Sequence, residues 1–343
     1  DRVSGPLRTF SVGFEGPGAV SELPFAREVA GFLGSEHHEL MMDPKTVASD
    51  LETIVDGLDA PLADPTAIPT WYMSKLARER VTVALSGEGA DEIFGGYARQ
   101  RYDVAIDRFG ALGRFLLPAV LRITGRKTSR RFLRRLEMEP GLRRQLDWGR
   151  VFQVDELDSL MCSPTVTDEA VLGPYEDLAQ RWLDLAATDP ANGRLMTDRE
   201  VFLPADLLPK VDRMSMAHSL EVRVPYLDNQ VSDLMLRVRG PLKQNLRRDK
   251  ILLREAAAAY LPETAAHRTK RGFEVPVGEW LRSSLRPLLV DWLAPETLDR
   301  QDVVKSETVS ALIDEHLHGV RDHGKPLWAL MVLSRWLETS GAR

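Results

Sequence analysis

The sequence has little cysteine and no long apolar run. Cys162 is the only cysteine among 343 residues, so no intramolecular disulfide can form and a reducing, cytoplasmic compartment is the simpler expectation. Its neighbours in SLMCSP include no obvious base, which favours a packing role over catalysis. No stretch approaches the roughly 20 apolar residues needed to cross a bilayer. The nearest, 327–333, is followed at once by Ser334 and Arg335, so no membrane partner is expected.

An excess of positive charge is also missing. The net charge of -6 and the pI near 5.8 provide no general attraction to nucleic acid, so no nucleic-acid partner is expected. Residues 122–150 are nevertheless rich in arginine. Their pattern favours a solvated helical face over a phosphate- or RNA-binding patch, because aromatic residues are sparse. The arginines concerned are Arg130, Arg131, Arg134, Arg135, Arg143 and Arg144.

The first hundred residues alternate short strand patterns with amphipathic helix patterns. Strands are expected at 8–14, 37–41 and 81–85, and helices at 22–33, 46–58 and 70–80. This alternation predicts an α/β fold with right-handed crossovers and a parallel sheet that has helices on both faces. The segment VTVAL at 81–85 has the composition of a buried strand.

From about residue 98 the strand patterns stop. Helical patterns follow, broken by prolines such as Pro204. With 43% hydrophobic residues, the chain can build one large domain or two packed ones. We therefore expect a nucleotide-type α/β layer at 1–97, followed by a large, mostly α-helical region at 98–343.

The sharpest local feature is the sequence SGEGADEIFGGY at 86–97, directly after the third expected strand. Ligands of open parallel sheets bind just beyond the carboxyl ends of the strands. Gly87 and Gly89 allow positive φ angles and a close approach of the backbone to a phosphate. Ser86 offers a hydroxyl and an amide to phosphate oxygens. The loop therefore predicts a phosphate-binding site.

Three carboxylates, those of Glu88, Asp91 and Glu92, lie within five residues of this loop. They are poorly suited to a bare anion, but they fit a Mg²⁺ ion that bridges them to the phosphates. The alternative is a glycine-rich turn before an acidic helix start, in which Asp91 and Glu92 complement the helix dipole.

The motif at 86–97 strongly resembles the second nucleotide-site motif of the glutamine-hydrolysing asparagine synthetase family. Further segments agree with that family in the same order, and the resemblance covers nearly the whole chain. Residues 100–200 are the least similar part and have the character of a helical insertion. The agreeing segments are TFSVGFE at 9–15, HHEL at 37–40, DAPLADPTAIPTWYMSKLARE at 59–79, LLPKVDRMSMAHSLEVRVPYLD at 207–228 and RTKRGFEVPVGEWLR at 268–282.

The resemblance implies the parallel sheet of the ATP pyrophosphatases, which is the adenine-nucleotide α-hydrolase type. In that family aspartate attacks the α-phosphate of ATP, giving β-aspartyl-AMP and pyrophosphate. Ammonia from glutamine then displaces AMP to give asparagine. ATP and Mg²⁺ are the implied cofactors, and aspartate with glutamine or ammonia are the implied substrates.

Matching positions carry the roles that the resemblance implies. Val12 is expected to flank the adenine, and Ser86 and Gly87 to contact the nucleotide. Asp91 resembles the carboxylate that holds Mg²⁺ on the pyrophosphate side. Glu88 resembles the glutamate that is needed for the acyl-adenylate step and for deprotonating the incoming ammonium.

Lys270, in RTKRGF, resembles the family lysine that steadies negative charge on the phosphates during adenylation. A cation placed there lowers the barrier, because adenylation concentrates charge on the α-phosphate and the leaving pyrophosphate. By local sequence alone, Lys270 beside Arg268 and Arg271 would be a solvated basic run. The resemblance favours the catalytic role.

Glu221 and Arg223, in LEVRVPYLD, have two interpretations. They either form a buried ion pair or bind the amino and carboxylate groups of aspartate, for which an arginine fork is well shaped. Asp212, Arg213 and Asp228 are available for a structural network in the first case.

His37 and His38 are adjacent in an expected strand, so their side chains should point to opposite faces. We expect one in the core and the other exposed. A metal site is not expected there.

The chain departs from the family pattern near its start. The phosphate loop Ser-Gly-Gly-x-Asp-Ser, which precedes the TFSVGF-like segment in the family, is absent, as are the nucleophilic cysteine and the glutaminase domain. We expect a partial chain that lacks the first strand of the sheet, binds ATP poorly alone and cannot hydrolyse glutamine. A covalently linked glutaminase domain is then the implied partner in the full-length protein. The oligomeric state is open, with a homodimer as one option.

Two alternative functions remain. One is a related amidotransferase of the same superfamily that amidates another carboxylate. The other is a non-catalytic remnant that keeps the fold as a binding module. Retention of Glu88, Asp91 and Lys270 argues against the remnant, because an unused site has no physical need for three matched charges.

Overall fold

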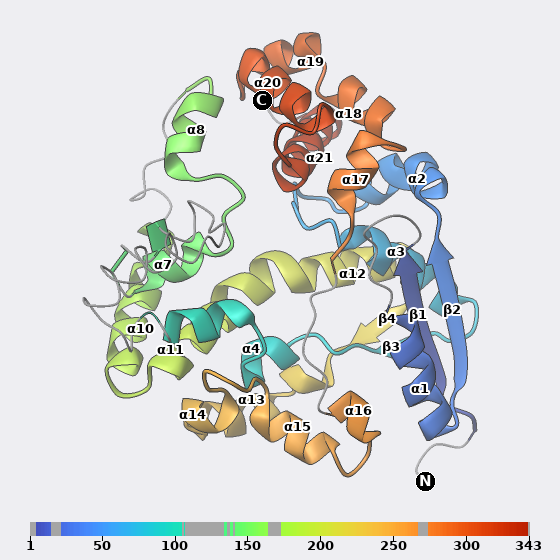
Figure 1. Cartoon of the computed structure of the whole chain (residues 1–343), viewed down its shortest axis with the longest axis vertical. Coiled ribbons are helices and arrows are strands. Elements are labelled where there is room, and N and C mark those ends of the chain that lie inside the picture. Colours follow the sequence, from blue (N-terminus) through green and yellow to red (C-terminus); the bar gives the residue numbers. More distant parts are fainter. Residues whose placement is uncertain are drawn as a thin grey trace.

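The structure is a computed structural model that describes residues 5–14, 22–104, 106, 134–135, 138–139, 141–163, 173–266 and 274–341. Lys270, Arg130 and Arg131 lie outside these ranges, and so does much of the predicted insertion at 100–200. Within the described part the fold is mixed α/β and mostly helical, with small parallel sheets (Figure 1).

The N-terminal elements form a strand–helix–strand unit. Strand β1 (Arg8–Phe14) pairs in parallel with β2 (Glu36–Met42), and helix α1 (Leu23–Leu33) connects them. Gly34 ends α1 in the left-handed region at φ 63°, where glycine carries no steric penalty. These elements confirm the predicted strands and helix to within one residue.

The next elements also follow the prediction closely. Helix α2 (Pro44–Asp56) begins two residues early because the Asp43 side chain accepts hydrogen bonds from the amides of Lys45 and Thr46. Helix α3 (Ala67–Arg78) and strand β3 (Val83–Leu85) follow, and the short helix α4 (Ala90–Phe94) completes this part.

Strand β3 pairs in parallel with β4 (Glu221–Arg223), a strand that the sequence did not predict. Three residues are too short to show periodicity, and long-range hydrogen bonds define β4: Glu221 donates to the carbonyl of Thr82, and Ser86 donates to that of Arg223. In the described part of the chain, the β1–β2 and β3–β4 pairs form separate sheets. Parallel pairing is thus confirmed, whereas a single sheet of ATP pyrophosphatase type stays a prediction.

The expectation that VTVAL is a buried strand was wrong. The Leu85 side chain is 74% exposed and that of Val83 is 39% exposed. Among the described residues, β3 has a hydrogen-bonded neighbour on one edge only. The apolar composition of this segment was therefore not a sufficient basis for predicting that its side chains are buried.

The rest of the described chain is helical apart from β4. Helices α11 (Pro190–Thr197) and α12 (Leu208–Met216) are joined by a π-helical segment, Asp198–Leu207, into one run that crosses the middle of the molecule (Figure 1). Pro204 lies inside this run. The prediction that Pro204 breaks the helix is wrong, because the wider π turn accommodates a residue that has no N–H. The other helices are α7 (Leu142–Asp147), α8 (Val154–Leu160), α10 (Glu176–Thr188), α13 (Asn229–Arg237), α14 (Gly240–Lys243), α15 (Ile251–Ala257), α16 (Glu263–Ala266), α17 (Val277–Arg282), α18 (Arg286–Trp292), α19 (Pro295–Gln301), α20 (Ser306–Leu317) and α21 (Gly324–Ser340).

The largest hydrophobic core joins the two ends of the chain. Phe14 of β1 meets Trp280 of α17 edge to face, with ring centroids 5.8 Å apart. The same cluster contains the fully buried Leu51 of α2, Leu281 of α17 and Trp328 of α21. The N-terminal strands and the C-terminal helices therefore stabilise each other through shared apolar burial.

The arginine-rich stretch is only partly a solvated face. Arg143 is exposed, as expected. Arg144 is completely buried, with its Nε atom 3.3 Å from Asp103 Oδ1, and Arg135 is buried with its Nε atom 2.7 Å from Asp147 Oδ2. The solvated interpretation is wrong for these two residues, because their carboxylate partners offset the cost of burying charge.

Cys162 is partly buried, and its amide donates to the carbonyl of Val303. Desolvation and the nearby Asp302 raise the pKa of its thiol. A raised pKa disfavours the thiolate nucleophile, so the structure supports the predicted packing role.

None of the helices within the described ranges is long and apolar enough to cross a membrane.

The burial of Leu281 in the shared core leads to a prediction about the stability of the protein. Leu281→Ala should lower the free energy of unfolding by about 2–5 kcal/mol, because it leaves a cavity at a side chain with no exposed surface. Urea denaturation followed by circular dichroism measures this change. Leu234→Ala, at a side chain that is 63% exposed, is the control and should cost less than about 0.5 kcal/mol. Equal losses in both variants would contradict the position of Leu281 in the core.

Candidate active site

A cavity of about 1010 Å³ opens at the carboxyl end of β3. Its lining includes five residues that the sequence predicted for the nucleotide site: Val12, Ser86, Gly87, Glu88 and Asp91. Val12 comes from β1, and the other four come from the turn after β3 and the start of α4. The fold therefore brings together residues that are more than 70 positions apart in the sequence.

The turn after β3 depends on one glycine conformation. Gly89 lies at φ 87° and directly precedes α4, and a Cβ atom at this position would collide with the Leu227 side chain. The amide of Ser86 donates to the carbonyl of Arg223 at 2.9 Å and extends the β3–β4 pairing into the turn. Gly87 does not adopt the positive φ that was predicted for it, but the space beside its Cα is open. That space leaves room for a ligand to approach the backbone.

The three carboxylates of the loop separate into two environments. Glu88 and Asp91 line the cavity. Glu92 is buried, and it accepts a short hydrogen bond from the hydroxyl of Tyr97. Burial raises the pKa of Glu92 to about 7. Only two of the three carboxylates therefore face the space where a nucleotide would bind.

Asp91 already has a cationic partner. Its Oδ1 atom lies 3.0 Å from the Nζ atom of Lys250, and the two side chains are 21% and 20% exposed. Lys250 comes immediately before α15, far from the loop in sequence. The sequence analysis did not identify this contact.

Lys210 is a second cation that the sequence analysis missed. Its side chain is 4% exposed and its Nζ atom lies 2.7 Å from both Asp64 Oδ2 and Thr66 Oγ1. All three residues line the cavity. Burial raises the pKa of Asp64, but the ion pair with Lys210 and the hydrogen bonds from Thr66 outweigh it, so that this pKa lies below its usual range. The only signal in the sequence was that these residues belong to the family-like segments at 59–79 and 207–228.

Asp206 lies one helical turn before Lys210. Burial and the neighbouring charge of Asp64 raise the pKa of its carboxyl to about 6, although Lys210 opposes this shift. Asp206 itself does not line the cavity, but its charge acts on the Asp64–Lys210 pair that does.

Glu221 and Arg223 do not line this cavity. They form an ion pair of 2.7 Å along β4, and their side chains are 56% and 64% exposed. The predicted pairing is confirmed, whereas its burial is wrong because both side chains face solvent. Arg213 pairs with Asp59 at 3.3 Å and with Asp212 at 3.5 Å. A role for Glu221 and Arg223 in binding substrate stays a prediction without geometric support.

His37 and His38 point to opposite faces, as expected for neighbours in a strand. His37 contacts the Thr9 hydroxyl at 2.9 Å, whereas His38 stacks on Phe10. The expectation of one core and one exposed histidine is wrong, because both are partly buried, with side chains 13% and 18% exposed.

Comparison with known protein families identifies the family of this chain. The model of the Asparagine synthase family matches residues 1–338. The chain belongs to the asparagine synthase family.

Individual relatives of this family member cover the same region. The Bacillus subtilis (strain 168) protein "Asparagine synthetase [glutamine-hydrolyzing] 1" is 32% identical over 336 residues, which are 96% of this chain and 52% of that protein. The Mycobacterium tuberculosis (strain ATCC 25618 / H37Rv) protein "Putative asparagine synthetase [glutamine-hydrolyzing]" is 31% identical over 342 residues, 96% of this chain and 50% of its own length. The fungal "Amidase chry2" of Gibberella zeae is 22% identical over 308 residues, 80% of this chain and 44% of its own length. The chain thus spans about half the length of these curated relatives.

The donors on the cavity wall fit the ligand requirements of a magnesium ion that is also bound by phosphates. No group of three or more metal-ligating side chains occurs among the residues that the structure describes. Mg²⁺ usually takes one or two carboxylates, keeps several waters and completes its shell with substrate phosphates. Glu88 and Asp91 supply that number of carboxylates, and the open backbone at Gly87 leaves space for phosphates.

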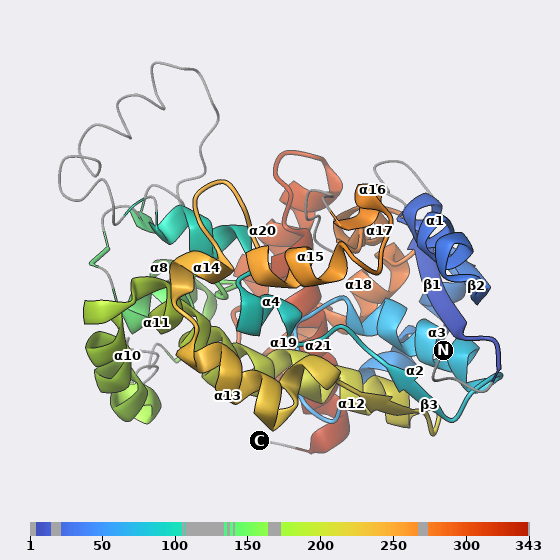
Figure 2. The same cartoon turned by 90° about the horizontal axis from the view of Figure 1, so that it is seen from below.

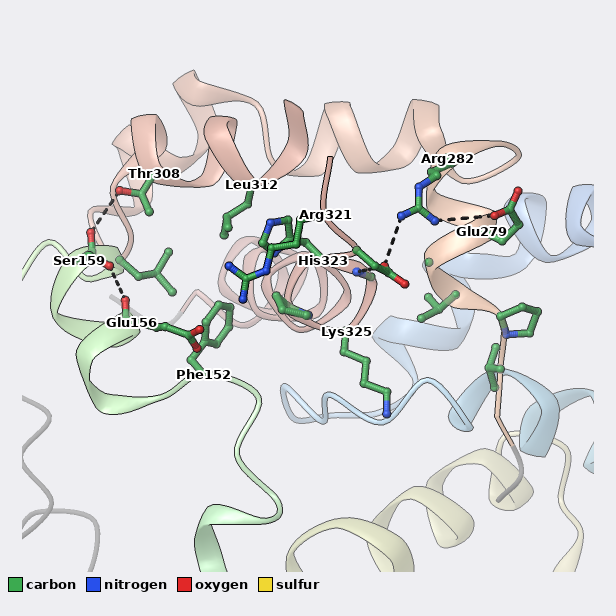
Figure 3. A pocket seen from close by; sticks show the side chains of 18 residues that line it. Phe152, Glu156, Ser159, Glu279, Arg282, Thr308, Leu312, Arg321, His323 and Lys325 are labelled. Atoms are coloured by element: carbon green, nitrogen blue, oxygen red, sulfur yellow. Dashed lines mark hydrogen bonds and ion pairs between the residues drawn. The ribbon is translucent and has the colours of Figure 1, made fainter. Parts of the chain in front are cut away.

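A second cavity of about 680 Å³ lies among α8, α17, α20 and the start of α21. Figure 3 shows its side chains, with Arg282 held by Glu279 at 3.7 Å and by Asp322 at 3.5 Å. Lys325 lines both cavities, and in Figure 3 it extends away from Arg282. Of the predicted site residues that the structure describes, none lines the second cavity.

The raised pKa of Asp206 predicts that the substitution Asp206→Asn increases the stability of the folded protein by an amount that depends on pH. The folded state holds the proton with a pKa of about 6, above the ordinary value of 3.8, so ionised Asp206 costs stability above pH 6. The variant should be more stable at pH 8, by up to about 3 kcal/mol, and this gain should shrink as the pH falls from 6 to 4. Chemical denaturation across this pH range measures the difference. The exposed Asp291→Asn is the control and should change stability little at any pH; a gain at Asp206 that is constant with pH would contradict the raised pKa.

Proposed function

We propose that this chain is the synthetase part of an asparagine synthetase, which converts aspartate to asparagine through β-aspartyl-AMP at the expense of ATP. One observation carries the proposal. Val12, Ser86, Gly87, Glu88 and Asp91, which were selected from the sequence alone, line one cavity at the carboxyl end of a parallel strand. Nucleotides bind at this position in α/β proteins.

The backbone of the turn is suited to the nucleotide phosphates. Ser86 and Gly87 bring amides and a hydroxyl to the cavity wall, and Gly87 has free space beside its Cα. Val12 is 6% exposed and provides an apolar surface against which the adenine ring packs.

Acidic and basic side chains both contribute to neutralising the charge of the phosphates: the acidic ones through a bound Mg²⁺ ion, and a lysine directly. When bound, Mg²⁺ neutralises charge on the pyrophosphate that leaves. Asp91 holds this ion, and Glu88 takes a proton from the incoming ammonium so that neutral ammonia can attack. We retain Lys270 as the lysine that steadies the phosphates, on the resemblance alone, because it lies outside the described residues.

We propose glutamine as the source of the ammonia. The similar proteins of Bacillus subtilis and Mycobacterium tuberculosis are named glutamine-hydrolyzing, and this chain matches about half of each. A linked glutaminase domain is the partner that would release ammonia from glutamine.

A second candidate is the amidation of another carboxylate. The similarity to "Amidase chry2" supports it, because a protein with a different name shares the same region. A non-catalytic remnant receives less support, because Glu88 and Asp91 remain together on the wall of the cavity.

Product analysis tests these functions. Purified full-length protein supplied with aspartate, Mg-ATP and glutamine should form asparagine and pyrophosphate in equal amounts. Pyrophosphate that appears only with a different carboxylic acid would favour the second candidate. Calorimetric titration that detects no Mg-ATP binding would favour the remnant.

The position of Glu88 in the lining of the cavity leads to a prediction about its substitution. Glu88→Gln in the full-length protein should lower aspartate-dependent pyrophosphate release at least ~100-fold, because the amide cannot take a proton from ammonium or carry charge beside the metal. Glutamine hydrolysis, measured as glutamate formation, should remain mostly intact. Glu296→Gln is the control, since Glu296 is exposed on α19 and lines neither cavity, and it should retain most of both activities. A comparable loss of both activities in Glu88→Gln would show that the synthetase site lies elsewhere.

A further inference from the structure

The contact between Asp91 and Lys250 is enforced by the fold. Gly96 packs against this contact. A Cβ atom at residue 96 would collide with Asp91 Oδ1 and would lie 2.6 Å from Lys250 Cε. The amides of Gly95 and Gly96 both donate to the carbonyl of Asp91 at 3.0 Å. The missing side chain of Gly96 therefore leaves room for a lysine against the carboxylate.

The backbone of Lys250 is held in an unfavourable conformation. Its φ of 45° lies in the left-handed region, which costs a residue with a side chain about 1 kcal/mol or more. Its amide donates to the carbonyl of Gly95 at 3.1 Å, and α4 and α15 lie side by side (Figures 1 and 2). The main chain is thus fixed beside the loop, whereas the lysine side chain keeps its rotatable bonds.

The position of this ammonium conflicts with the metal proposed for Asp91. A Mg²⁺ ion bound by the Asp91 carboxylate would lie close to the Lys250 ammonium, which is 3.0 Å from Oδ1 of the same group. Two cations also repel each other at this distance. Nucleotide phosphates would reduce this repulsion, because they add negative charge near both cations.

We propose that Lys250 is a place-holding cation for Asp91, so that a divalent metal ion enters the site only together with nucleotide phosphates. This role rests on the proposed function, since it requires the cavity to bind Mg-ATP. Lys250 acts here as a positioning residue. It neutralises and orients Asp91 in the empty site and prevents free metal ions from occupying it without substrate.

Binding of Mn²⁺, used as a probe for Mg²⁺, tests this role without turnover. Paramagnetic resonance of free Mn²⁺ would be recorded with the full-length protein, with and without a non-hydrolysable ATP analogue. Wild type should bind Mn²⁺ weakly alone and at least ~10-fold more tightly with the analogue. Lys250→Met should bind Mn²⁺ alone at least ~10-fold more tightly than wild type, and the analogue should then add little.

Three further variants make the test decisive. Lys250→Gln is a second neutral replacement in case the methionine variant does not fold, as judged by its thermal midpoint. Lys250→Arg keeps a cation and should retain most of the coupling. Lys45→Met, at an exposed lysine of α2, should behave as wild type.

The outcomes separate this role from the proposed function. Equal Mn²⁺ binding by wild type and the neutral variants, with the analogue bound by all of them, would overturn the place-holding role and leave the synthetase proposal standing. Absence of analogue binding in every protein would overturn both.

Discussion

The hydrogen bond from the Ser86 amide to the carbonyl of Arg223 ties the two halves of the candidate site together. It extends the pairing of β3 with β4 into the turn that carries Glu88 and Asp91. Helix α12, which carries Lys210, ends a few residues before β4. A short parallel pair of strands therefore fixes the loop relative to a lysine that is more than 120 positions away.

Buried charge is the second constraint on this site. Lys210 is almost completely buried, and its pairing with Asp64 and Thr66 offsets the cost of removing an ammonium from water. Glu92 avoids the same cost by a hydrogen bond from Tyr97 and by a raised pKa. Lys210 lines the cavity together with Asp64 and Thr66, whereas Glu92 lies outside its lining.

The predicted local elements were largely correct, because local signals define them. The strand and helix patterns before residue 86 and the glycine at the end of α1 are readable from neighbouring residues, although the cap at Asp43 was not predicted. The failures share one cause. The strand β4, the exposure of Leu85 and the burial of Arg144 all depend on partners that are distant in sequence.

The sequence by itself determined the family motifs and the residue types that the nucleotide site needs, because the chemistry of phosphates and Mg²⁺ requires glycines, carboxylates and a cation whatever the fold. Only the tertiary structure decided which of the three loop carboxylates face the cavity, that Glu221 and Arg223 face solvent, and that Lys210 and Lys250 lie beside Asp64 and Asp91. The physical reason is that an ion pair of about 3 Å depends on how separate helices and strands pack. Periodicity within one segment contains no information about that packing.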